Sequence, residues 1–81
     1  MVLVVGAEAG VVSEVLARAA VDDDVLVLDG SAARLERLFD SLPDPRLWFM
    51  IGGPDVIPLP DGSVDEVVGA EATPEVDRVT R

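Results

Sequence analysis

Three uninterrupted apolar runs constrain the fold of this 81-residue chain more than any other feature. They span Val2–Val5, Val25–Leu28 and Leu47–Ile51, and a glycine follows each of them closely. A strand with one solvated face alternates apolar and polar residues, whereas a continuous apolar run is typical of a strand buried on both faces of a parallel sheet. The runs therefore predict three strands of such a sheet.

Apolar residues at helical spacing follow the first two runs. The first predicted helix begins at Val11, and the second begins after Ser31, a good N-cap residue. Pro43 and Pro45 end the second helix. This alternation of strands and helices argues for an α/β fold with right-handed crossovers. The two apolar helix faces consist of Val12, Val15, Leu16 and Ala19, and of Leu35, Leu38 and Leu42.

The C-terminal part of the chain is less regular. A loop rich in Pro, Asp and Gly at 54–63 precedes a fourth, short strand at 64–70. The tail at 73–81 has two interpretations, a short last helix or a frayed end. We expect one α/β domain over 1–81, a short parallel sheet of about four strands with flanking helices. Its parts are a strand, glycine loop and helix at 1–20, a strand and helix at 24–42, a strand, loop and strand at 47–72, and the tail.

The charge of the chain excludes several functions. Sixteen acidic residues against six arginines and no lysine give a net charge of −10. Such a surface repels phosphate backbones and anionic membranes, so we expect no nucleic-acid partner and no membrane partner. The chain also has no cysteine and no histidine, which rules out disulfides, thiolate metal sites and imidazole chemistry. We expect no metal site.

The small size of the chain favours association. A domain of this length buries only about 60 to 65% of the surface that its unfolded chain exposes, so a monomer is marginally stable. With no disulfide or metal to help, oligomerisation is the remaining stabiliser. No stretch reaches the roughly 18 apolar residues of a membrane span, and the first residues have no features of a signal peptide. The expected location is the cytoplasm.

Three segments, in the same order, resemble motifs of the class I S-adenosylmethionine-dependent methyltransferases. Residues 2–10 resemble the first motif, a strand followed by a glycine-rich loop, which in Rossmann-like folds holds a cofactor. Residues 25–31 resemble the second motif, in which an acid ends the second strand. Residues 52–65, with the run Pro-Leu-Pro-Asp-Gly-Ser-Val-Asp, look like the family's adenine loop and the entry into its fourth strand. The resemblance covers residues 2 to about 70 and implies the N-terminal half of the class I fold, truncated.

The resemblance also implies a degenerate site for S-adenosylmethionine. The acid expected within the first strand is Val4, the middle glycine of the loop is Glu8, and the acid that would receive the adenine amino group aligns with Gly53. The Glu8 side chain either blocks the cofactor or reaches its amino or sulfonium group. We expect weak binding or none. The implied cofactor-binding residues are Gly6, Glu8, Gly10, Asp29 (at the ribose hydroxyls), Gly30 and Asp55 (in place of the adenine-binding acid).

No residue is assigned to catalysis. Glu71 is either a general base or, as we favour, one exposed acid among many. Trp48 and Phe49 either stack on an adenine or, as we favour, pack in the core or an interface. The run at 22–24 of three aspartates binds a hard cation or, as we favour, forms a solvated turn. A dinucleotide site is disfavoured because the first turn lacks the Gly-x-Gly-x-x-Gly spacing.

Two functions follow from these observations. The favoured one is a methyltransferase-like module, not catalytic alone, that acts as a homodimer or in a complex with a fuller methyltransferase. In the family the first strand is central and the fourth lies beside it, so an apolar edge at the fourth strand would be open, with Val67 and Val68 at the interface. The alternative is a minimal S-adenosylmethionine-dependent methyltransferase for a small molecule, with an active site that a second subunit completes.

Overall fold

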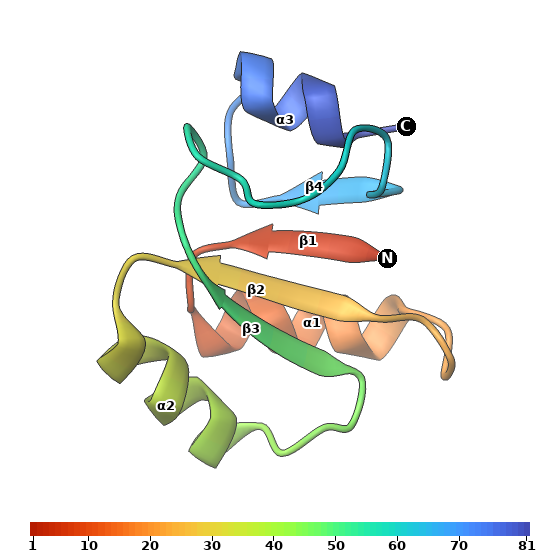
Figure 1. The fold of residues 1–81 in the computed structure, drawn as a ribbon. Coiled ribbons are helices and arrows are strands. Elements are labelled where there is room, and N and C mark those ends of the chain that lie inside the picture. Colours follow the sequence, from red (N-terminus) through yellow and green to blue (C-terminus); the bar gives the residue numbers. More distant parts are fainter.

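A computed structural model describes all residues from Met1 to Arg81 and has an α/β fold. Four parallel strands form one sheet, and three helices flank it (Figure 1). The predicted fold class is therefore confirmed. None of the helices is long and apolar enough to cross a bilayer. The elements are β1 (Val2–Val5), α1 (Ala9–Arg18), β2 (Val25–Asp29), α2 (Ala32–Ser41), β3 (Leu47–Ile51), β4 (Glu66–Val68) and α3 (Pro74–Val79).

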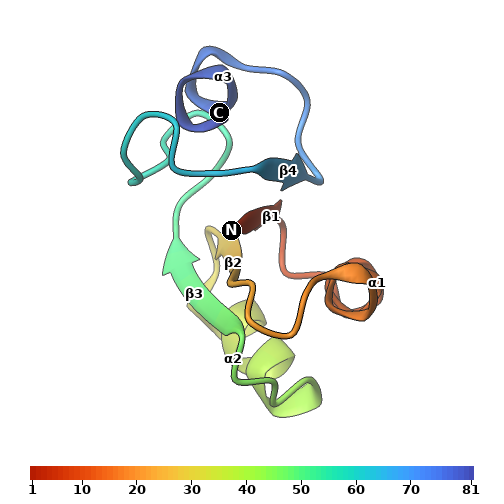
Figure 2. The same ribbon diagram turned by 90° about the vertical axis from the view of Figure 1, so that its right-hand side faces the viewer.

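The strand order is β3-β2-β1-β4, which places β1 and β2 in the centre of the sheet. Val25 of β2 pairs with Val2 of β1 on one side and with Leu47 of β3 on the other. Every residue of β2 is buried, as its uninterrupted apolar run predicts. The order reverses between β1 and β4, and the segments that follow these two strands leave toward opposite faces of the sheet (Figure 2).

α1 and α2 cover one face of the sheet (Figure 2). The N-cap of α2 is Ser31, as predicted, and its side-chain oxygen accepts a hydrogen bond from the backbone N–H of Arg34 at 3.3 Å. Alternate residues of β1 and β2 point toward these helices and form one core with them. That core consists of Val2, Val4, Val12, Val15, Leu16, Val25, Val27, Leu35 and Leu38.

α3 and the loop at 54–63 cover the opposite face. Thr73 caps α3 by accepting a hydrogen bond from the N–H of Val76 at 3.1 Å, and Pro74 occupies the first turn. The tail is therefore a short helix, and the interpretation of it as a frayed end is wrong. The second core consists of Leu3, Leu26, Leu28, Ile57, Val64, Val76 and Val79.

Two element boundaries differ from the prediction. α1 begins at Ala9 rather than Val11, so Gly10 lies in the first turn of the helix and not in the preceding loop. β4 contains three residues rather than the whole of 64–70. Val64 instead pairs with the chain end, because its N–H donates to the Val79 carbonyl and its carbonyl accepts from the Arg81 N–H, both at 2.9 Å.

The two edges of the sheet differ in length and chemistry. β4 is short, and its exposed Glu66 accepts two hydrogen bonds from Arg18 at 2.9 Å. Val67 and Val68 are half-buried against the two cores. β3 has five apolar residues and no charge, and none of them is fully buried. The longer apolar edge therefore lies at β3, whereas the resemblance placed it at the fourth strand.

Candidate functional site

The turn after β1 and the end of β2 meet at the carboxylate of Asp29. Its Oδ2 accepts a hydrogen bond from the backbone N–H of Ala7, and its Oδ1 accepts one from the N–H of Ser31, both at 2.8 Å. The Nε of Arg34 lies 3.6 Å from Oδ2, and the Asp29 side chain is only 7% exposed. Asp29 thus joins the glycine turn to the start of α2 and uses both of its oxygens to do so.

These contacts keep Asp29 ionised. The hydrogen bond from Ala7 is the main cause that lowers the pKa of the Asp29 carboxyl, and the Ser31 N–H and the charge of Arg34 lower it further. Burial opposes these effects because it disfavours the charged form. The net shift of the pKa is downward, which suits a charged anchor of the turn rather than a proton donor.

Glu8 lies at the start of α1, next to this anchor. It occupies the N-cap position of the helix, but its side chain makes no capping hydrogen bond. Its Oε1 lies 4.0 Å from the point where a Cβ on Gly10 would stand. The carboxylate of Glu8 therefore lies over the first turn of α1. Gly6 and Gly30 are in the turns that follow β1 and β2, and a Cβ on either of them would meet no atom within 4 Å.

Asp55 is on a separate turn. Pro54 and Asp55 form its tip, and Gly53 and Val56 close it with backbone hydrogen bonds of 3.4 and 3.2 Å. The side chain of Asp55 is exposed and makes no hydrogen bond or ion pair. The structure thus brings the implied residues after β1 and β2 together and leaves Asp55 apart from their hydrogen-bond network.

The loop at 54–63, which the resemblance assigns to adenine, is bonded to α3. Arg78 of α3 makes five hydrogen bonds of 2.7–3.0 Å. Its acceptors are both carboxylate oxygens of Glu75, the Oδ1 of Asp61 and the carbonyls of Ile57 and Leu59. Glu75 also accepts from the N–H of Ile57 at 3.0 Å. The backbone of Ile57 and Leu59 and the carboxylate of Asp61 are therefore turned toward the helix.

Neither Glu75 nor Arg78 is a predicted functional residue. The signals that could have found them are the capping pattern Thr73-Pro74, the i,i+3 spacing of the acid and the arginine, and the same spacing of Val76 and Val79. These signals predict a helix with one apolar face and one ion pair. They do not say which segment the helix packs on.

The Glu75–Arg78 pair makes the stability of the loop depend on pH. Arg78, with the Ile57 N–H, lowers the pKa of Glu75 from 4.5 to about 2. Because the folded value is the lower one, the pair stabilises fully above about pH 4.5 and loses this effect as the pH falls through about 2. Glu75→Gln should therefore reduce the drop in Tm between these two pH values, measured by circular dichroism.

The matched control is Glu71→Gln, because Glu71 is exposed and has no hydrogen bond or ion pair. We expect this control to follow the wild-type curve. A Glu75→Gln curve parallel to the wild type would show that the pair does not stabilise the fold.

The two aromatic residues of β3 have different surroundings. Trp48 is 58% exposed, and its Nε1–H donates to the Oδ1 of Asp24 at 3.1 Å. Phe49 packs against Phe39 of α2, with ring centroids 5.8 Å apart in an edge-to-face arrangement. The carboxylate of Asp24, one of the three consecutive aspartates, is thus bonded to the indole. Nowhere in the chain do three acidic residues lie close enough together to hold a metal ion.

The surface has two shallow hollows. One of about 190 Å³ lies between the glycine turn and α2, and one of about 500 Å³ lies along α2 and β3. In open parallel sheets, ligands bind where the strand order reverses, which is here between β1 and β4. Neither hollow lies there. A Cβ on Gly69 would stand 2.5 Å from the carbonyl oxygen of Val5, so the two strand ends are in close contact.

Comparison with protein-family models, curated proteins and solved structures gives no match to this chain. The fold and the site define a small α/β protein with an all-parallel sheet and a turn anchored by Asp29. The resemblance to class I methyltransferases stays a prediction from the motifs.

Proposed function

We propose that the chain is a methyltransferase-like module, not catalytic alone, that associates with a second copy of itself through β3. The observation that supports this proposal is that some backbone groups of β3 face away from the sheet. The carbonyl of Arg46 and the N–H of Gly52 bond to β2. Alternate residues of a strand turn their backbone groups to opposite sides, so Phe49 and Ile51 turn theirs outward, where another strand can pair with them.

Apolar side chains flank this open backbone. Ile51 is 56% exposed and Phe39 is 57% exposed. Phe39 and Phe49 line the hollow of about 500 Å³. A long, apolar edge without a charged residue is a template for pairing, and natural proteins normally protect such edges. The edge of β4 is protected by comparison, because it is short and carries the ion pair of Glu66.

A second copy fits this edge by symmetry. A twofold axis beside Phe49 would set the two β3 strands antiparallel, with each Phe49 opposite the other. The two sheets would then form one. Glu36 and Asp40 line the same hollow and would approach their copies, so we expect the dimer to strengthen as salt screens the repulsion.

Two placements argue against a site for S-adenosylmethionine. Asp29, which would meet the ribose hydroxyls, already accepts a hydrogen bond on each carboxylate oxygen, from the N–H groups of Ala7 and Ser31. The carboxylate of Glu8 lies over the helix start that the cofactor's own carboxylate would approach. These placements support a function without methyl transfer.

A minimal methyltransferase is the second candidate, because the strand order and the position of Asp29 at the end of β2 agree with the resemblance. Calorimetric titration with S-adenosylmethionine and S-adenosylhomocysteine separates the two candidates. We expect no saturable binding, and a dissociation constant below about 50 µM would overturn our preference. Tighter binding by the double variant Glu8→Gly, Gly53→Asp would support the motif alignment together with its degeneracy.

Light scattering on the purified chain tests the association itself. We expect a dimer at about 50 µM and a larger dimer fraction at higher salt. A monomer under both conditions contradicts self-association.

A further inference from the structure

The six arginines of the chain differ in the ion pairs that they form. Arg18, Arg46, Arg78 and Arg81 each have a carboxylate oxygen within 2.7–3.4 Å. Arg37 has no hydrogen bond or ion pair, although the chain carries sixteen acidic residues. Arg34 has only the contact of 3.6 Å to Asp29. In a protein this acidic, one guanidinium group with no ion pair, that of Arg37, and a second with a single long ion pair, that of Arg34, are an unusual use of positive charge.

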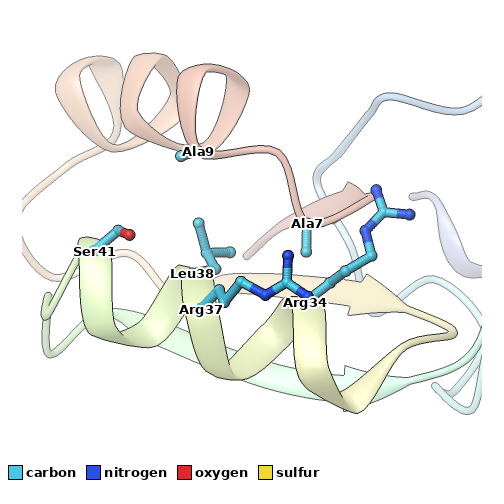
Figure 3. A pocket seen from close by; sticks show the side chains of 6 residues that line it. All are labelled: Ala7, Ala9, Arg34, Arg37, Leu38 and Ser41. Carbon is cyan, nitrogen blue, oxygen red and sulfur yellow. The ribbon is translucent and has the colours of Figure 1, made fainter.

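Both of these guanidinium groups line the hollow of about 190 Å³. Arg34 and Arg37 project from α2 toward the turn that carries Ala7, while Ser41 lies near the far end of the helix (Figure 3). Ala9, in the first turn of α1, forms the opposite wall (Figure 3). The hollow is therefore bounded on one side by two positive charges and a hydroxyl group.

The wall formed by α1 adds backbone donors. The first turn of this helix contains no acidic residue, and no side chain caps it. Its first N–H groups therefore have no acceptor from a cap, and they carry the positive end of the helix dipole. The arginine pair is the main attraction. The helix start adds to it, and the carboxylate of Glu8, which lies over that start, opposes this contribution.

We propose that this hollow binds a phosphate group, either free or at the end of a small phosphate monoester. Two guanidinium groups from adjacent turns of one helix suit a tetrahedral dianion, because each can donate to a different oxygen. Asp29 pairs with Arg34, and the carboxylate of Glu8 lies over the helix start, so Arg37 is the guanidinium group that has no carboxylate partner and is left to bind the ligand. This site is independent of the β3 edge.

Titration followed by ¹⁵N–¹H correlation spectra at low ionic strength tests the proposal. The probes are inorganic phosphate, glycerol 3-phosphate as a monoester, and acetate as a monoanion. We expect saturable shifts of the amides of Ala9, Gly10 and Arg37 with both phosphates and not with acetate. The double variant Arg34→Gln, Arg37→Gln should weaken phosphate binding by about tenfold or more, and Arg37→Gln alone should weaken it by about threefold.

The matched control is Arg18→Gln, which removes one positive charge at the other end of α1, where Arg18 contacts Glu66. This variant should bind phosphate within about twofold of the wild type, because it changes only the overall charge. Glu8→Gln should tighten binding, since it removes a negative charge from the helix start. The proposal is overturned if the shifts do not saturate, if acetate gives the same shifts, or if the double variant and the Arg18 control behave alike.

Discussion

Replacing Ile51 by lysine should dissociate the proposed dimer. The side chain is 56% exposed at the end of β3, so the change has little effect on the core of a monomer. In a dimer it would place a charge in an apolar contact, where it loses hydration without a partner. Twofold symmetry puts the substitution into the interface twice. We expect the dissociation constant to rise by about 100-fold, measured by sedimentation equilibrium.

The control for Ile51→Lys is Ala17→Lys, which adds the same charge on the exposed side of α1. It should leave the dimer unchanged. If both variants dissociate the protein equally, net charge rather than the β3 edge controls association. If neither does, the interface lies elsewhere, and Val67→Lys at β4 becomes the next variant to measure.

Single cysteines test the register of the pairing, because the chain has no cysteine of its own. With the twofold axis beside Phe49, the Cα atoms of the two copies lie about 5.5 Å apart at this position, a distance that a disulfide spans. Phe49→Cys should therefore form covalent dimers on oxidation. Ile51→Cys should not, since Ile51 would lie opposite Leu47 of the other copy. The reverse result would contradict this register while leaving the edge as the interface.

The two central strands could be predicted from the sequence because their apolar runs are incompatible with a strand that has one face in water. Val2–Val5 and Val25–Leu28 have no polar residue to turn toward water, so both faces must be covered. For Leu47–Ile51 the continuous apolar run predicts a strand correctly, but it does not predict the burial of that strand. It is equally apolar but lies at the edge, where its residues are only partly buried. Composition alone does not distinguish a central strand from an apolar edge strand.

The contacts of the candidate site could not be predicted, because they join segments distant in sequence. The motif places Asp29 at the end of a strand but does not say that its oxygens are bonded to Ala7 and Ser31. The run at 58–65 resembles an adenine loop, yet the carbonyl of Leu59 and the carboxylate of Asp61 accept hydrogen bonds from Arg78, almost twenty residues further along the chain. Local patterns predict helices and turns, whereas these partners depend on how the tail folds back.

Gly69 should be the position at which a small substitution has the largest effect on stability. Its φ of +85° is in the region that residues with a Cβ avoid, and a Cβ there would lie 2.5 Å from the carbonyl oxygen of Val5. The left-handed conformation costs about 1–2 kcal/mol, and relieving the clash with a central strand costs about 1–3 kcal/mol more. We expect Gly69→Ala to lower the free energy of unfolding by about 3 kcal/mol, in urea titration.

Gly62→Ala separates the two contributions to this effect. Gly62 also has a positive φ, of +64°, but a Cβ there would meet no atom within 4 Å. This variant should therefore lose only the conformational part, about 1 kcal/mol. An 81-residue fold has a total stability of about 4–12 kcal/mol, so Gly69→Ala removes a large share of it and Gly62→Ala a small one. Equal losses would mean that the end of β4 moves away from β1 at little cost when a Cβ is added at Gly69.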